Sequence, residues 1–215
     1  MQSTTNQDLS TVNPSLIEYV EKEILPLYDS FDAAHQRGHA RAVIEESMRL
    51  ASFYEVNPNI VYATAAYHDT GLLIDRELHH IYSGRRIRSD RNLLQWFTEE
   101  EIETIAQAAE DHRASSKEEP RSIYGKIVAD ADKELQPINC IRRAVQYTSS
   151  HYPDLSEEEQ YMRSAGHLQE KYAEGGYMHL WLKESREAPF LSDLRSIIND
   201  EKRLREVIFQ LMKEK

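Results

Sequence analysis

Apolar residues recur at helical spacing along nearly the whole chain, and this pattern restricts the fold more than any other feature. Leu16, Val20, Ile24 and Leu27 are three or four residues apart, which aligns them on one face of a helix. Alternating β-branched runs bounded by Asn-Gly or Asp-Gly turns, the usual sign of hairpins, are missing. We therefore predict an all-α fold, an orthogonal bundle of about eight to ten helices.

Prolines mark plausible helix starts at Pro14, Pro58, Pro137 and Pro189. Beyond the N-terminal stripe and the helix that begins near His39, the periodicity predicts further helical stretches near 58–70, 78–94, 99–112, 121–135, 137–150, 156–186 and 190–213.

The length of 215 residues and the hydrophobic content of 40% suit one substantial core. No repeat or low-complexity tract marks a linker, so we expect a flexible segment at 1–13 followed by a single helical domain at 14–215. Neither a signal peptide nor a membrane span is indicated, and the lone Cys140 cannot form an internal disulfide. We expect a cytoplasmic protein.

The net charge of −11 argues against binding to a long nucleic acid, because affinity for a phosphate backbone is built from clustered Lys and Arg. A small anionic substrate needs only a local positive pocket, and a metal ion can supply much of that field.

The segment from Ile60 to Tyr67 is a small-residue apolar helix that ends in His68 and Asp69, with Gly71 placed to terminate it. Alone, this pair could be a polar helix end that bonds the backbone. A carboxylate at the end of a buried helix is costly unless it is paired, hydrogen-bonded or bound to metal. Candidate partners are His39, at the start of another helix, and Asp132, which follows an apolar stretch. Two imidazoles and two carboxylates suit Mn²⁺, Fe²⁺, Co²⁺, Ni²⁺ or Zn²⁺ and leave coordination positions open.

The ordered set His39, then His68-Asp69, then Asp132 resembles the H…HD…D signature of the HD superfamily of metal-dependent phosphohydrolases. The similarity covers roughly residues 35–150 and includes the small apolar approach to His68, the Thr-Gly after Asp69, and Ala-Asp-Lys at 131–133. It implies a divalent metal ion held by these four residues, with Mg²⁺ added to the candidate metals, and with one ion favoured and two possible.

The resemblance also implies the reaction, in which a metal-activated water hydrolyses a small phosphorylated metabolite or nucleotide. His79, in a segment like the HxxxGA element of the superfamily, and His112 then line the pocket, either contacting phosphate or holding a second ion. Asp69, His79 and His112 are the expected catalytic residues. His80 is the less likely of the adjacent pair to point inward.

Arg85, Lys126 and Lys133 are candidate substrate-binding cations, although the arginines around position 85 also fit a solvated face paired with local acids such as Asp90. Asp130 competes with Asp132 as the fourth ligand. On a helix the two carboxylates point about 200° apart, so only one faces the metal, and the resemblance favours Asp132.

Two rival functions remain open: a non-catalytic HD fold that senses a nucleotide, and a diiron HD-type oxygenase that uses His79, His80 and His112. The cyclic-dinucleotide branch is disfavoured because its Gly-Tyr-Pro element is absent. The aromatic segment around Gly175 and Gly176 predicts a turn followed by a helix, and it can serve as a lid or as the interface of a homodimer.

Overall fold

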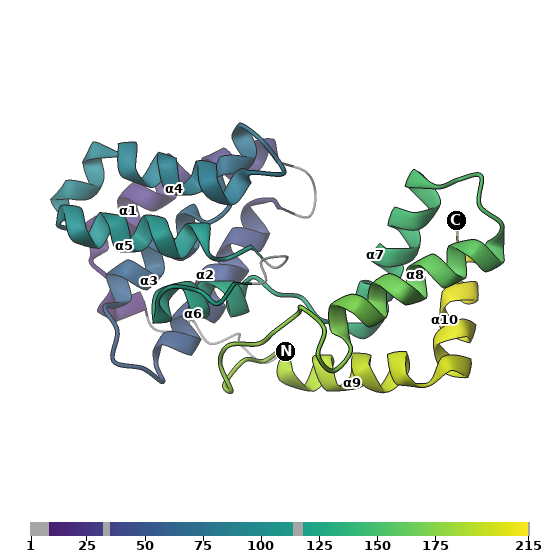
Figure 1. Cartoon of the computed structure of the whole chain (residues 1–215). Helices are drawn as coiled ribbons and strands as arrows, with labels where there is room; N and C mark the ends of the chain where they lie inside the picture. Colours follow the sequence, from purple (N-terminus) through teal and green to yellow (C-terminus); the bar gives the residue numbers. More distant parts are fainter. Residues whose placement is uncertain (1–8, 32–34, 114–117, 215) are drawn as a thin grey trace, which may run out of the picture. The chain divides into compact units, whose positions relative to one another are not determined.

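The computed structural model of the chain describes residues 9–31, 35–113 and 118–214 (Figure 1). All regular structure in these ranges is helical: ten α-helices, with short 3-10 turns and one π-helical turn between some of them. The predicted all-α fold is confirmed.

The helices divide into two compact units, Met1–Asp132 and Lys133–Lys215. The N-terminal unit contains α1 Pro14–Tyr19, α2 Arg37–Ala51, α3 Pro58–Tyr67, α4 His79–Ser89, α5 Glu99–Glu110 and α6 Ile123–Ala131. The C-terminal unit contains α7 Pro137–His151, α8 Glu157–Tyr172, α9 Ala188–Asn199 and α10 Glu201–Lys213. That the two units fold together as the single domain expected from the sequence stays a prediction.

Helix α3 is the centre of the N-terminal unit and packs against α2, α5 and α6 (Figure 1). It starts where Asn57 accepts a hydrogen bond from the Asn59 amide, with Pro58 in the first turn. Every side chain from Ile60 to Tyr67 is buried, so this helix has no solvated face. Its small residues let neighbouring helices approach closely, and its C-terminal end therefore lies deep in the unit.

The N-terminal stripe departs from regular helical spacing at one point. Leu16, Val20 and Ile24 are buried as predicted, but Leu27 is only half-buried. A π-helical turn at Val20–Ile24 and a 3-10 turn at Leu25–Ser30 interrupt the 3.6-residue period. The change of register places Leu25 and Tyr28 in the core instead.

Residues 9–13, expected to belong to a loose N-terminal segment, contain the 3-10 turn Leu9–Thr11 and the residue that caps α1. The Asn13 amide also donates to Asn59 Oδ1 at 2.8 Å. Residues 1–8 of that expected segment lie outside the described residues.

Two helix predictions in the C-terminal unit are wrong in extent. The predicted stretch 156–186 begins with the expected Ser156 cap but ends at Tyr172, and the following segment to Glu187 contains no helix. Gly175 has a φ of +82°, a left-handed conformation that suits glycine and breaks the helix. The stretch 190–213 is two helices, because Asp200 leaves the helical conformation and caps α10 by accepting from the Arg203 amide.

No helix within the described ranges is both long enough and apolar enough to cross a membrane.

Candidate metal centre

The end of α3 is fixed by a buried tyrosine that the sequence analysis did not single out. The Tyr28 hydroxyl donates to the Ala66 carbonyl at 2.9 Å and accepts from the Asp69 amide at 3.3 Å. These two contacts hold the backbone on either side of His68. Tyr28 lies four residues after Ile24, a helical spacing that could have indicated its burial, although the stripe was continued through Leu27 instead.

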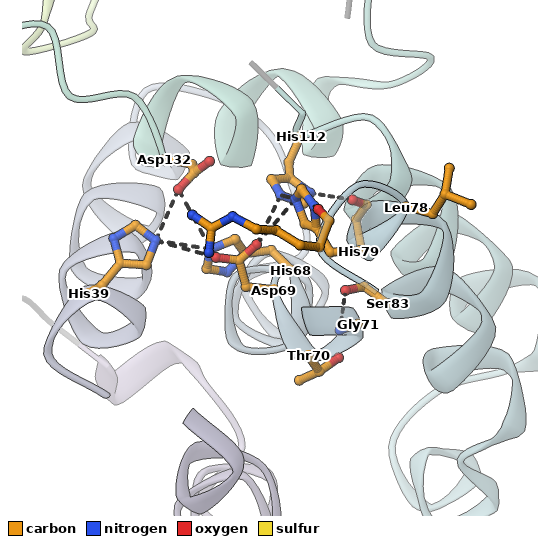
Figure 2. Close-up of polar contacts among 12 residues, drawn as sticks. His39, His68, Asp69, Thr70, Gly71, Leu78, His79, Ser83, His112 and Asp132 are labelled. Carbon is orange, nitrogen blue, oxygen red and sulfur yellow. Dashed lines mark hydrogen bonds and ion pairs between the residues drawn. The ribbon is translucent and has the colours of Figure 1, made fainter. Parts of the chain in front are cut away.

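A first cluster of ligand atoms joins three separate elements (Figure 2). It consists of His39 in the first turn of α2, His68 and Asp69 at the end of α3, and Asp132 at the end of α6. His39 Nε2 lies 3.1 Å from Asp132 Oδ1, 3.4 Å from His68 Nε2 and 3.7 Å from Asp69 Oδ2. His68 Nε2 lies 3.3 Å from Asp69 Oδ2 and 3.6 Å from Asp132 Oδ1. The structure thus brings His39, His68 and Asp69 into one ligand group, and Asp132 joins it through its contacts with the two histidines.

A second cluster forms on the other oxygen of Asp69 (Figure 2). Asp69 Oδ1 lies 3.4 Å from Nε2 of His79, the first residue of α4, and 3.4 Å from Nε2 of His112, just after α5. The two Nε2 atoms are 3.2 Å apart. Asp69 therefore presents one oxygen to each cluster.

In three of the histidines Nδ1 bonds the backbone, and Nε2 is the ring nitrogen that faces the clusters. Nδ1 of His68, His79 and His112 donates to a backbone carbonyl three residues earlier, at 2.7, 2.8 and 2.5 Å respectively. A carbonyl only accepts, so each Nδ1 carries a proton and Nε2 is the nitrogen that faces Asp69; when the ring is neutral, Nε2 presents a lone pair there. Such second contacts orient the histidines of metal sites in this way.

The two clusters have a closed floor and a more open edge. The floor is formed by His68, Asp69 and His112, which are 0%, 3% and 1% exposed. His39, His79 and Asp132 are only partly buried and form the edge. These three residues are therefore the part of the two clusters that solvent contacts.

The electrostatics of the floor favour ionised carboxylates. Burial acts to raise the pKa of Asp69, but the charge of His68 and the hydrogen bond with His112 outweigh it, so the pKa falls well below its ordinary value. Burial of His68 disfavours its charged form, yet Asp69 and Asp132 raise its pKa well above the usual range. At His79, burial and then the charge of His112 lower the pKa, which favours the neutral ring that binds metals.

The donor atoms fit divalent cations. Atoms about 2.1 Å from one ion, at tetrahedral or octahedral angles, are about 3.0–3.4 Å from one another. The separations around His68 and around His79 are 3.1–3.7 Å and 3.2–3.4 Å. When both rings are neutral, the second cluster brings together two lone pairs and a carboxylate oxygen, and such a set of acceptors is repulsive unless a proton or a cation lies among them. Nitrogen and oxygen donors together suit Mn²⁺, Fe²⁺, Co²⁺, Ni²⁺ or Zn²⁺.

The remaining predicted site residues have other contacts. Arg85 is exposed, with its guanidinium 5.1 Å from the centroid of the Tyr82 ring. Lys126 forms an ion pair with Glu119 at 2.5 Å. Lys133, the first residue of the C-terminal unit, is 8% exposed and lies 5.9 Å from the centroid of the Trp181 ring. Their predicted role in binding substrate stays a prediction.

Two neighbours of the ligands differ from them in their surroundings. Asp130 is buried on α6, two residues before Asp132, whose carboxylate is the one that meets His39 and His68. His80 has a buried Nδ1 without a hydrogen-bond partner, and burial lowers its pKa to about 4.

One arginine of α4, Arg88, has acidic partners on α5. Arg88 pairs with Glu103 and Glu110 at 2.7 and 2.5 Å. Asp90, expected to pair with these arginines, accepts hydrogen bonds from the hydroxyls of Tyr19 and Tyr67 at 2.6 and 2.5 Å.

Comparison with known proteins identifies the region that carries both clusters. Residues 37–135 match the family model described as HD domain, a span that begins with α2 and includes His39, His68-Asp69 and Asp132. Neither the curated proteins nor the solved structures gave a match. The superfamily consists mainly of metal-dependent phosphohydrolases, as the resemblance implies. Residues 37–135 thus match the HD domain family, and the His/Asp clusters within this span fit an HD metal-binding site.

Proposed function

We propose that the chain is a metal-dependent phosphohydrolase that acts on a small phosphorylated metabolite or nucleotide. The observation that carries the proposal is the convergence of ligand atoms on both oxygens of Asp69, a buried carboxylate at the end of an apolar helix. A buried group of this kind is costly without a cation.

The proposal places two ions at this centre. From the sequence we expect one ion, held by His39, His68, Asp69 and Asp132. The second set of ligand atoms, from Asp69, His79 and His112, supports another position next to the first. In this arrangement Asp69 binds both ions, while His79 and His112 act as ligands rather than as direct contacts to phosphate.

When bound, a divalent cation is a Lewis acid that lowers the pKa of water and neutralises charge growing on phosphoryl oxygens. The protein contributes the geometry. The floor of His68, Asp69 and His112 excludes bulk water from one side, and the open edge admits the phosphate. The Nδ1 contacts fix the rings before substrate arrives, so little reorganisation is needed during the reaction.

The proposed substrate class follows from the charge of the chain. A chain with a net charge of −11 repels a long polyanion, whereas a single phosphate can be attracted by the local field of two cations. Arg85, Lys126 and Lys133 are proposed to assist by steering the anion. Lys126 lies on α6, which ends at Asp132, and Arg85 lies on α4, which begins at His79.

The experiment measures metal content and turnover on the same preparation. Elemental mass spectrometry counts the ions in the purified protein, and phosphate release is followed for nucleoside mono-, di- and triphosphates and sugar phosphates with Mn²⁺, Co²⁺, Ni²⁺ or Mg²⁺. We expect two ions and ion-dependent release from a subset of these compounds. The variant His68→Ala is expected to lose the first ion and turnover, and Gly166→Ala, at an exposed helical site with open space, is the matched control.

Other outcomes distinguish the rival functions. Retained metal without phosphate release from any compound would favour a non-catalytic nucleotide sensor. The second cluster also supports a diiron HD-type oxygenase, since it adds two histidine ligands beside the shared carboxylate. Two irons with an oxygen-dependent absorption spectrum would favour that enzyme and contradict the phosphohydrolase.

A further inference from the structure

The glycine two residues after Asp69 lies against the first turn of α4 with no room for a side chain. A Cβ at position 71 would be 1.9 Å from the His79 carbonyl oxygen and 2.6 Å from the Ser83 amide nitrogen. These are backbone atoms, which a small side-chain adjustment cannot move. Only glycine allows this approach.

A buried hydrogen bond joins the same two segments. The Gly71 amide donates to Ser83 Oγ at 2.9 Å, and Ser83 is 0% exposed. Figure 2 shows this contact below His79, on the opposite side of the centre from His39 and Asp132. The contact therefore connects the turn after Asp69 with the helix that supplies His79.

We propose that Gly71 and Ser83 are positioning residues that set His79 against Asp69 and so create the second ion position. We call this pair the Gly71–Ser83 latch. The inference rests on the two-ion form of the proposed function. Neither residue of the latch is proposed to contact an ion; both act by holding His79 in place.

The latch acts on one cluster because of where it lies in the chain. His79 and Ser83 are one helical turn apart on α4, so a shift of this turn moves the His79 ring relative to Asp69 Oδ1. His79 Nδ1 bonds the Arg76 carbonyl, within the connection between Gly71 and α4, so the ring follows the same backbone. His39 and Asp132 belong to α2 and α6 and are independent of this contact.

The test measures ion binding rather than activity. Apo protein is titrated with Mn²⁺ by calorimetry, and ions are counted by elemental mass spectrometry. Wild-type protein is expected to bind two ions. Ser83→Ala leaves the Gly71 amide without its partner and is expected to weaken the second ion by about 10- to 100-fold, the range for changes that disturb the orientation of a metal ligand. The first ion is expected to bind with unchanged affinity.

Ser47→Ala is the matched control. Ser47 is also 0% exposed, but its Oγ has no hydrogen-bond partner. Removal of this hydroxyl is expected to leave the binding of both ions unchanged. Gly71→Ala is expected to abolish the second ion, and Gly166→Ala, where a Cβ meets nothing within 4 Å, should retain it. If Gly71→Ala does not fold, Ser83→Ala against Ser47→Ala decides the question.

Three results would overturn the inference. The wild-type protein could bind only one ion, or Ser83→Ala could bind both ions with wild-type affinity. The third result is an equal loss of affinity for both ions in Ser83→Ala. The test is separate from that of the proposed function. If the wild type binds two ions but releases no phosphate, and the variants lose the second ion selectively, the phosphohydrolase is contradicted and the role of the latch is supported.

Discussion

The first and second clusters share Asp69 but differ in charge and in how they are built. The first contains two carboxylates and two imidazoles, and the second contains the shared carboxylate and two imidazoles. A cation is held more strongly where more negative charge faces it, so we expect the first position to bind more tightly. In the proposed two-ion arrangement, Asp69 faces both positions, while every other ligand faces one.

Asp69→Asn gives the largest expected effect, because it removes the only charge common to both clusters. The amide has the shape of the carboxylate but cannot neutralise two cations, so binding of both ions should weaken by more than about 100-fold. Turnover should fall with it. Ion content and phosphate release report these losses, and circular dichroism should show unchanged helix content. A variant that keeps either ion at wild-type affinity would contradict the sharing of Asp69.

Asp132→Asn should affect the first position only. Its Oδ1 contacts His39 and His68, and hydrogen bonds from these histidines outweigh burial and lower its pKa, as for a carboxylate that stays ionised. We expect loss of the tighter ion, retention of the weaker one, and loss of turnover. Asp130→Asn is the control, and it should retain both ions even if its burial makes the substitution costly for stability. The reverse result would assign the fourth ligand to Asp130.

His79→Ala and His80→Ala test the second position from adjacent residues. His79 Nε2 lies 3.4 Å from Asp69 Oδ1, so its removal should weaken the second ion by more than about tenfold and leave the first unchanged. His80 has a buried nitrogen without a partner, and its replacement should leave both ions and should not lower the melting temperature. Calorimetric titration with Mn²⁺ checks both variants. Equal weakening by the two substitutions would argue against a specific site at His79.

The difference between the clusters also explains how much of the centre could be predicted from the sequence. The end of α3 carries a strong signal, since eight buried residues lead directly to His68 and Asp69. His39 and Asp132 follow from their order along the chain and from the family resemblance. The latch leaves no comparable signal, because the value of Gly71 and Ser83 lies in a close approach between two backbones.

Some elements of the fold were not predicted for a similar reason, because they depend on local backbone geometry. Helical periodicity allows either Leu27 or Tyr28 to follow Ile24 on the buried face, and after the π-helical turn it is Tyr28 that lies in the core. It also passes through Asp200, a residue whose side chain caps a new helix instead of continuing the old one. Local backbone departures of this kind depend on tertiary packing, which a single sequence does not display.

Arg85→Ala has the smallest expected effect and tests whether charge outside both clusters matters. The guanidinium is exposed and lies over the Tyr82 ring, so its attraction for a phosphate is weakened by water and by salt. We expect KM to rise by about twofold at low ionic strength, with kcat and both ions unchanged. The increase should disappear as salt is added, because screening removes a long-range attraction but not a direct contact. A loss of kcat, or an increase in KM that persists in high salt, would instead place Arg85 in contact with the substrate.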